Sequence, residues 1–327
     1  MRIGILGAGR IAKVHARSIA AHPGASVAMI ADPCEDAARE LAEAHGARHT
    51  ADPAEVISDP EVDAIIICSP TPLHAEQILA AAKVGKPVLC EKPIAMDTET
   101  IDKLFADLEG LDPQVMLGFN RRFDPSFAKV RRLVDGGVIG KVEQVTIISR
   151  DPAAPPREYL ASSGGIFKDM TIHEFDMARF FLGDIATVFA VGQNLDPELA
   201  DSGDFDGAII TLTNADGVAA TITNSRHCSA GYDQRLEVFG DKATVNADNI
   251  RETTVQVSTG EATDAKDPYL DFFLERYDAA YRLELAEFID AVENKRTPSP
   301  SLKDGAAALA IAEAAEKSAR TGTPVTL

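Results

Sequence analysis

The sequence predicts an α/β protein of two domains, with a doubly wound parallel sheet followed by an α+β domain built on a large, mostly antiparallel open sheet. Up to residue 120, short apolar runs alternate with alanine-rich helical patterns. Beyond residue 120, several runs alternate apolar with polar residues and are separated by Gly, Asn and Asp turns. The length of 327 residues also suits two hydrophobic cores better than one.

The first domain is expected over residues 1–120 as a Rossmann-type sheet. Its strands are continuous apolar runs, which is typical of parallel strands covered by helices on both faces. In chain order the runs are RIGILG, SVAMIAD, VDAIIICSP, KPVLCEKP and QVMLGFN.

The second domain is expected over residues 121–327 as an α+β domain. It opens on a helix in DPSFAKVRRLVDGG, with Asp124 or Ser126 near its N-cap and Gly136 at its end. A second helix is predicted to begin near Met170. The strand-like runs are VEQVTIIS, TVFAVGQN, DGAIITLTN, GVAATITNS, QRLEVFG and KATVNAD. Helical patterns over 269–294 and 303–319 close the chain, and whether the last helix packs back on the first domain is left open.

The composition limits the partners. A formal net charge of −19 would repel nucleic acid and anionic lipid, so the expected ligand is a small neutral molecule. The four cysteines form no C-x-x-C pair, and the chain starts directly on a strand-like run, which favours the cytoplasm. No metal site is expected, because Gly46 interrupts the one helical His pair, His45 and His49.

A G-x-G-x-x-A loop follows the first strand and predicts a dinucleotide site. Gly7 permits a tight turn, Gly9 lets the backbone approach a pyrophosphate, and Ala12 lets the helix pack closely on the strand. Arg10 and Ile11 open that helix, where free N–H groups and the helix dipole favour a phosphate.

Asp32 ends the second strand and is expected to accept hydrogen bonds from the adenosine ribose. Its carboxylate would repel a 2′-phosphate, so NAD is favoured over NADP. The alternative interpretation is a plain glycine turn, with Asp32 capping the helix that follows Pro33.

Two further groups of residues indicate chemistry. Glu91-Lys92-Pro93 stands at the C-terminal end of a strand, where doubly wound sheets bind their ligands. Asp169 and His173 are four residues apart, a spacing that places both on one face of a helix.

With these motifs the chain resembles the Gfo/Idh/MocA family of oxidoreductases over nearly its whole length. The stretches that carry the resemblance are GILGAGRIA, ICSPTPLHAE, CEKPIA, GFNRRFDPSF, the Asp-x-x-x-His helix and GYDQRLEVFG. Within the family, GFNRRFD and GGIFKDMTIHEFDMARF look most like the inositol 2-dehydrogenase branch.

The resemblance implies a catalytic set of Lys92, Asp169 and His173. Neutral His173 suits the removal of a hydroxyl proton, and Lys92 suits the stabilisation of the developing alkoxide. Asp169 would fix the tautomer of the imidazole or orient the substrate. Taken singly, Lys92 could be a strand-end lysine, Asp169 a helix cap and His173 a core residue.

The resemblance also implies contacts with both ligands. Ser69, His74 and Glu91 are expected beside the cofactor, His74 in a structural or cofactor-adjacent role. The expected substrate contacts are Asn120, Arg121, Asp151 and Tyr232. Arg122 could face the substrate instead of Arg121, since neighbours on a strand point oppositely. For these residues the alternative is ordinary surface polarity.

The implied activity is NAD-dependent oxidation of a secondary hydroxyl of a cyclic polyol, with myo-inositol the expected substrate and its 2-keto derivative the product. A sugar or scyllo-inositol dehydrogenase of the same family is the first alternative. A dinucleotide-binding sensor without catalysis is the second. Related enzymes pair their open sheets between subunits, so a homotetramer or homodimer is expected.

Overall fold

A computed structural model describes residues 1–327, except for the side chains of residues 161 and 162. The chain forms two compact units. The first unit comprises Met1–Phe123 and Ala279–Leu309, and the second comprises Asp124–Asp278 and Ala310–Leu327. The sequence placed one division after residue 120, whereas in the structure the first unit also takes in a late segment of the chain.

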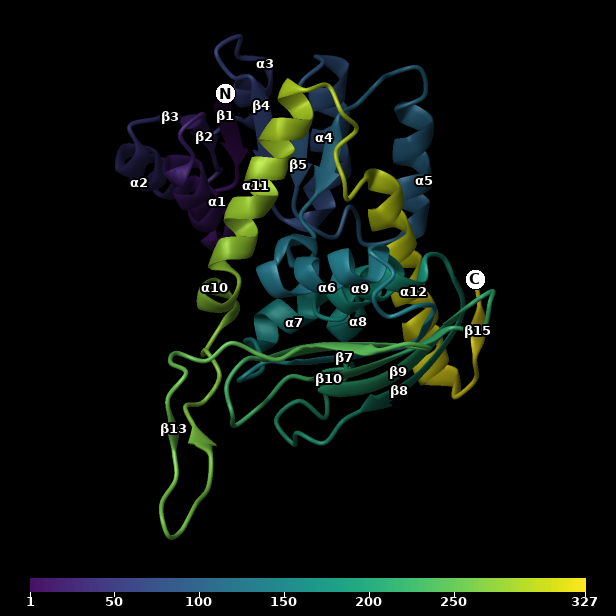
Figure 1. The fold of residues 1–327 in the computed structure, drawn as a ribbon. Coiled ribbons are helices and arrows are strands. Elements are labelled where there is room, and N and C mark those ends of the chain that lie inside the picture. The colour runs from purple at the N-terminus through teal and green to yellow at the C-terminus, as the bar shows by residue number, and fades with distance from the viewer. The chain divides into compact units, whose positions relative to one another are not determined.

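The first unit contains a six-stranded parallel sheet of order β3-β2-β1-β4-β5-β6 (Figure 1). Five strands match the predicted apolar runs: β1 (Arg2–Leu6), β2 (Ser26–Ala31), β4 (Ala64–Ile67), β5 (Val88–Cys90) and β6 (Val115–Leu117). The edge strand β3 (Arg48–Thr50) has the sequence RHT, and its three residues carry no apolar pattern that would have predicted it. The doubly wound first domain is therefore confirmed.

Helices cover both faces of this sheet. They are α1 (Arg10–Ala21), α2 (Glu35–His45), α3 (Pro53–Ser58), α4 (His74–Lys83), α5 (Thr98–Asp107) and α11 (Asp278–Glu293), with short 3-10 helices at Thr71–Leu73 and Asn120–Phe123. Leu285 and Phe288 of α11 join the same core cluster as Ile3 and Ile5 of β1. The late segment thus supplies part of the apolar cover that the parallel strands require.

The second unit contains a seven-stranded sheet of order β12-β11-β7-β10-β9-β8-β15. Its strands are β7 (Val142–Arg150), β8 (Ile185–Gln193), β9 (Gly207–Asn214), β10 (Ala219–Ser225), β11 (Asp233–Gly240), β12 (Thr244–Ala247) and β15 (Val325–Thr326). The pair β7–β10 is parallel and the remaining pairs are antiparallel. The predicted open, mostly antiparallel sheet is confirmed.

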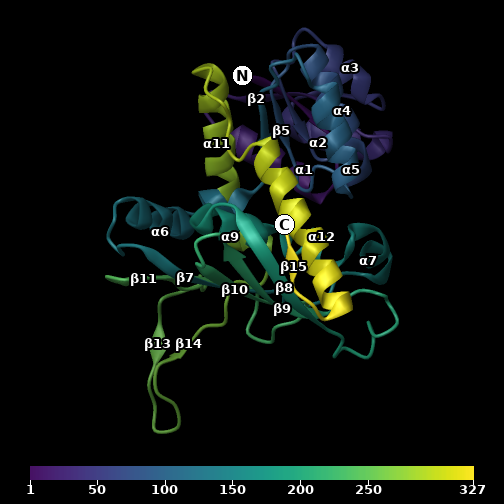
Figure 2. The ribbon, with the colours of Figure 1, turned by 90° about the vertical axis from the view of Figure 1, so that its right-hand side faces the viewer.

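Helices gather on one side of the second sheet, as Figure 2 shows for α6 and α9. The helices of this unit are α6 (Pro125–Asp135), α7 (Arg157–Ser163), α8 (Gly165–Asp169), α9 (Ile172–Leu182), α10 (Phe273–Arg276) and the C-terminal part of α12 (Leu302–Thr321). The other side exposes apolar side chains that alternate with buried ones along the strands: Phe189, Val191, Ile209 and Phe239.

The helix expected near Met170 is α9, which begins at Ile172, and the short helix α8 precedes it. The helical pattern that starts at residue 269 becomes α10 and α11, the first of which begins at Phe273. Asp124 caps α6 as predicted, because its carboxylate accepts the N–H groups of Ser126 and Phe127. A hairpin, β13 (Gln256–Val257) with β14 (Ala265–Lys266), extends from the second unit. In the part of the chain that is described, no helix is long and apolar enough to span a membrane.

Candidate active site

The glycine-rich loop between β1 and α1 has the geometry that a dinucleotide requires. Gly7 has φ +102°, and a Cβ there would lie 2.7 Å from the carbonyl oxygen of Cys68. A Cβ at Gly9 would meet nothing within 4 Å, so space remains above the loop. Gly9 is also the N-cap of α1 and has no side chain to satisfy the first N–H groups of Arg10 and Ile11. These donors and the helix dipole suit a pyrophosphate.

Asp32 lies at the end of β2 and is tied to the same loop. Its Oδ2 accepts the N–H of Ala8 at 2.7 Å, and its Oδ1 accepts the N–H of Cys34 at 2.8 Å. Helix α2 has Cys34 as its N-cap, so Asp32 does not cap it. Each carboxylate oxygen keeps a further acceptor position, which is what the two ribose hydroxyls of NAD need. The residues of this loop therefore fit the cofactor.

The imidazole of His74 connects the loops that follow β4 and β5. Its Nδ1 lies 2.7 Å from the carbonyl oxygen of Pro93 and its Nε2 lies 2.8 Å from that of Ser69. Burial lowers the pKa of His74, and its hydrogen bonds to the two carbonyl oxygens oppose this effect by raising the pKa. The Ser69 hydroxyl donates to Gln77 at 2.6 Å. The structure thus brings Ser69 and His74 together as one support for the loop that contains Lys92.

A second buried histidine supports the other side of Lys92. The Nε2 of His15, in α1, lies 2.8 Å from Glu91 Oε1. A Cβ at Gly118, beside β6, would lie 3.1 Å from the Glu91 carboxylate, so Glu91 is packed closely. Lys92 itself is half-buried. The sequence analysis did not single out His15, because one histidine within an alanine-rich helix has no distinguishing pattern.

Asn120 and Arg121 are buried in the 3-10 helix that follows β6. The assumption that Arg121 and Arg122 alternate along a strand is wrong, because both lie in this helical turn. The Arg122 guanidinium donates to Asp304 at 3.1 Å. Burial raises the pKa of Asp304, but the Arg122 charge and the hydrogen bonds from Ser301 outweigh it and lower the pKa to about 2. Arg122 is therefore engaged by an ion pair.

Asp169 and His173 lie on either side of the junction between α8 and α9. Asp169 is the last residue of α8, and His173 is the second residue of α9. The junction residues Met170 and Thr171 keep right-handed helical angles, so the two side chains are still about one turn apart. The N-cap of α9 is Thr171, so Asp169 does not cap the helix that carries His173.

A buried polar network fixes α9 on the sheet. The hydroxyl of Thr171 donates to Asn224 Oδ1 at 2.9 Å, and Asn224 Nδ2 lies 3.3 Å from Glu174 Oε2. The same Asn224 amide donates to the carbonyl of Ser149 in β7 at 3.2 Å. Because these groups are buried and bonded to one another, the first turn of α9 has a defined position. The structure buries Glu174 completely.

Asp151 and Tyr232 belong to the second unit. Asp151 follows β7, and its N–H donates to the carbonyl of Ser225 at the end of β10. The ring of Tyr232 is buried and makes edge contacts with Phe272 and Tyr277. Because β7 and β10 are parallel, the C-terminal ends of both strands lie at the same edge of the sheet, and Asp151 and Arg226 follow there.

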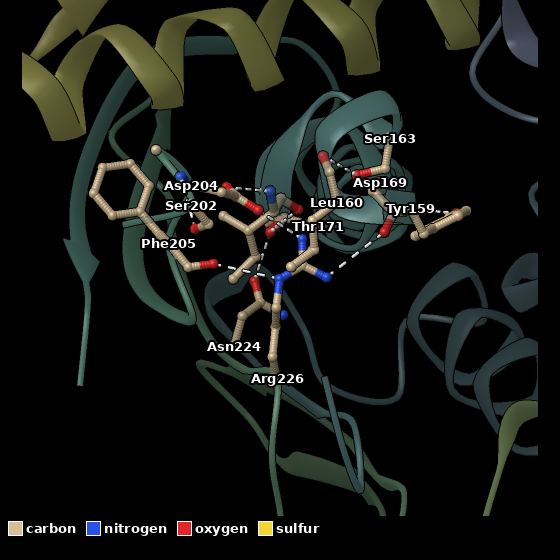
Figure 3. A network of polar contacts seen from close by, with 12 residues as sticks. Tyr159, Leu160, Ser163, Asp169, Thr171, Ser202, Asp204, Phe205, Asn224 and Arg226 are labelled. Carbon is tan, nitrogen blue, oxygen red and sulfur yellow. Dashed lines mark hydrogen bonds and ion pairs between the residues drawn. The ribbon is translucent and has the colours of Figure 1, made fainter. Parts of the chain in front are cut away.

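Three residues that no sequence pattern indicated form a connected group with Asp169. The hydroxyl of Tyr159 donates to Asp169 Oδ1 at 2.8 Å, and the guanidinium of Arg226 lies 3.7 Å from its Oδ2 (Figure 3). Asp204 binds that guanidinium at 2.9 Å. These residues come from separate segments of the chain, so no local spacing could have grouped them.

The predicted catalytic residues are divided between the two units. The first unit provides the dinucleotide loop and the amine of Lys92, and the second provides the carboxylate of Asp169 and the imidazole of His173. Among the described residues, no group of three or more His, Cys, Asp or Glu is arranged to hold a metal ion. An amine, a carboxylate and an imidazole are suited to moving a proton to or from a hydroxyl group.

Two family profiles match the chain. Residues 1–119 match the oxidoreductase family profile described as an NAD-binding Rossmann fold, and residues 131–327 match the C-terminal alpha/beta domain of the same oxidoreductase family. The first unit is accordingly an NAD-binding unit.

Curated relatives and solved structures match over nearly the full length. An inositol 2-dehydrogenase of Rhizobium meliloti is 44% identical, and a myo-inositol 2-dehydrogenase of Thermotoga maritima is 46% identical; each alignment covers 97% of this chain and 96% of the relative. The crystal structure of a myo-inositol dehydrogenase from Corynebacterium glutamicum is similar with a TM-score of 0.97 and 50% identity, covering 100% of this chain and 98% of the other. The chain belongs to the Gfo/Idh/MocA family of NAD-dependent oxidoreductases.

Proposed function

We propose that the protein oxidises myo-inositol to its 2-keto derivative, scyllo-inosose, with NAD as the hydride acceptor. The observation that carries this proposal is the 46% identity, over 97% of the chain, to a protein named myo-inositol 2-dehydrogenase. The chain also has the Lys92, Asp169 and His173 set that the chemistry needs. A sensor without catalysis has no use for these three residues together.

The proposed reaction needs three actions from the protein. His173, as a neutral imidazole, removes the proton from the substrate hydroxyl. Lys92 donates a hydrogen bond to the same oxygen and stabilises the negative charge that develops on it. Asp169 orients the imidazole or the substrate. Bound NAD would supply the acceptor for the hydride that leaves the carbinol carbon. The carbon–oxygen bond becomes a carbonyl, and the proton passes from His173 to solvent.

We further propose which of the remaining predicted residues bind NAD and which bind the polyol. The loop residues Gly7, Gly9, Arg10, Ile11, Asp32, Ser69, His74 and Glu91 bind or support NAD. The polar side chains of Asn120, Arg121, Asp151 and Tyr232 bind the polyol hydroxyls. Arg121 is the residue proposed here, and Arg122, which pairs with Asp304, is the alternative. In this division residues 1–120 serve the cofactor, apart from Lys92 and Asn120, and residues 121–327 serve the substrate and the assembly.

The protein is also proposed to form a homo-oligomer through the helix-free side of its second sheet. Val191 and Ile209 are opposite each other in the β8–β9 register, and both are exposed. Phe189 and Phe239 add two exposed aromatic rings on the same sheet. Large apolar side chains exposed on an open sheet face are typical of a protein interface. Light scattering should give the mass of a dimer or tetramer, and Ile209→Asp should reduce it; a monomer in both cases would refute the interface.

A cytoplasmic location completes the proposal. All four cysteines are free thiols. Two of them, Cys68 and Cys90, are buried, where a disulfide would be protected from reductants. Free thiols suit a reducing compartment. Fractionation of the native cells, with detection by antibody, tests this point.

The formation of NADH with a panel of polyols tests the activity. Turnover with myo-inositol at a kcat/KM above those for scyllo-inositol and glucose is the expected result. A higher kcat/KM for scyllo-inositol or glucose would replace the proposed substrate. NAD binding by calorimetry without turnover of any polyol would support the sensor instead.

A further inference from the structure

The buried guanidinium of Arg226 lies between two carboxylates. Its side chain is only 1% exposed. One terminal nitrogen lies 2.9 Å from Asp204 Oδ2, and the other lies 3.7 Å from Asp169 Oδ2. The Nε atom donates to the carbonyl of Phe205 at 3.3 Å. Figure 3 shows Arg226 reaching up from the end of β10 toward these groups. A buried arginine is retained only where its partners are well placed, because desolvation of the charge is costly.

Asp204 has a second role at the start of α8. Its Oδ1 accepts the N–H of Ile166 at 2.9 Å, in the first turn of that helix. A Cβ at Gly165, where φ is +80°, would lie 2.8 Å from the same oxygen. The Asp204 carboxylate therefore approaches the backbone closely at Gly165, where any other residue would place a Cβ in its way. Because α8 has five residues, Asp204 binds one end of it while Arg226 faces Asp169 at the other end.

The hydroxyl of Tyr159 holds the remaining oxygen of Asp169. It donates to Oδ1 at 2.8 Å, while Arg226 faces Oδ2. The Tyr159 residue is 49% exposed, so its contribution to the core is small. The two carboxylate oxygens of Asp169 thus have partners from different segments of the chain. The Tyr159 hydroxyl donates a hydrogen bond to one, and the Arg226 guanidinium faces the other with its charge.

We propose that Arg226 and Tyr159 are positioning residues for Asp169, with Asp204 fixing both Arg226 and the helix that carries Asp169. The arrangement keeps the carboxylate in one orientation during turnover. This proposal rests on the proposed function, in which Asp169 takes part in the reaction. A geometric shift of about 1 Å at such a group can cost about 100-fold in rate, so these contacts should be visible in kcat.

Four variants test the proposal, each measured for kcat, for the KM values of NAD and polyol, and for melting temperature. Tyr159→Phe should lower kcat about 10-fold, because one hydrogen bond to the charged Asp169 is lost. Its melting temperature should stay unchanged. Arg226→Met should lower kcat about 100-fold, and Arg226→Lys should recover part of that loss by restoring the charge. Arg296→Met is the control, since Arg296 pairs with Glu287 and Asp290 of α11 and the loss of these pairs should leave kcat unchanged.

The outcomes separate positioning from a purely structural role. If Arg226 only stabilised the fold, Arg226→Lys would lower the melting temperature and leave kcat per folded enzyme at the native value. Should Arg226→Met fail to fold, Tyr159→Phe and Arg226→Lys still decide the question. Native kcat in both of these variants overturns the proposal.

Asp169→Asn separates this inference from the proposed function. If Asp169→Asn retains native turnover, the role of Asp169 itself is wrong, and the proposed mechanism fails first. If Asp169→Asn is inactive while Tyr159→Phe and Arg226→Lys keep native kcat, only the positioning role fails. Loss of kcat in all three supports both.

Discussion

The imidazole of His15 is paired with the carboxylate of Glu91, at 2.8 Å between Nε2 and Oε1. His15 is fully buried and belongs to the helix that opens the dinucleotide site, while Glu91 immediately precedes Lys92. The pair therefore links the element that supports the pyrophosphate to the residue that is proposed to stabilise the alkoxide. On the other side of Lys92, His74 binds the carbonyl of Pro93.

Glu91→Ala should weaken both folding and turnover. The variant leaves the Nε2 of His15 buried without its partner, which costs about 1–3 kcal/mol. The free energy of unfolding in urea should fall by that amount, and kcat should fall because Lys92 loses its neighbouring anchor. Glu91→Gln keeps an acceptor at the same place and should be milder in both respects. Equal losses in the two variants would contradict the importance of this hydrogen bond.

Glu284 should make stability depend on pH. Both of its carboxylate oxygens are buried and have no hydrogen-bond partner among the described residues. Burial raises the pKa of Glu284 well above its usual value, and the charge of Glu91 raises it further. The folded protein thus holds this proton to a higher pH than the unfolded chain, whose glutamate pKa is about 4.3. The resulting stability is complete below about pH 4.3 and is lost as pH rises through the folded pKa.

Glu284→Gln removes this titration. As pH rises, the free energy of unfolding of the variant should increase relative to that of the native protein, by at most about 1.4 kcal/mol per pH unit. Urea unfolding at about pH 5 and about pH 8 measures the difference. Glu287→Gln on the exposed side of the same helix is the control. A difference that stays constant between the two pH values would show that Glu284 does not titrate in this range.

Lys92→Ala and His173→Ala should each lower kcat by about 100-fold or more, with little effect on the affinity for NAD. The reason is that both side chains are proposed to act on the reacting hydroxyl rather than on the dinucleotide. Steady-state kinetics give kcat, and calorimetry gives the dissociation constant of NAD. Lys129→Ala, on α6, provides a matched control. Near-native turnover in either variant would remove that residue from the mechanism.

Asp32→Ala should weaken NAD binding and relax the discrimination against NADP. The carboxylate that accepts ribose hydroxyls and repels a 2′-phosphate is then absent. The ratio of kcat/KM for NAD to that for NADP should fall. The loss of the hydrogen bond to Ala8 will also loosen the glycine-rich loop, so the melting temperature is measured in parallel. An unchanged cofactor ratio would refute the role of Asp32.

Local patterns predicted much of the fold and the cofactor loop. The apolar runs of the first unit became parallel strands because continuous hydrophobicity is the direct signature of burial on both faces. Gly7 was identifiable because the turn needs positive φ, and Asp124 because a carboxylate before a helix satisfies its first N–H groups. In each case the cause lies within a few residues of the effect.

Other features depend on contacts that the local sequence does not contain. The break between α8 and α9 follows from tertiary anchors, Asp204 at one end of α8 and Asn224 beside Thr171. Arg121 and Arg122 lie in a 3-10 turn rather than a strand, which a short run of polar residues did not distinguish. Arg226 was not identified because its carboxylate partners come from distant segments.

The segment between β8 and β9 also limits how this protein can change through insertions and deletions. Surface connections usually tolerate such changes. Here the segment contains Asp204, which holds Arg226, and Asp206, whose buried carboxylate binds the N–H groups of Leu195 and Asp196. Altering its length would move Arg226 away from Asp169. Natural variation in length should therefore concentrate in the β13–β14 hairpin instead, whose exposed strands take no part in these contacts.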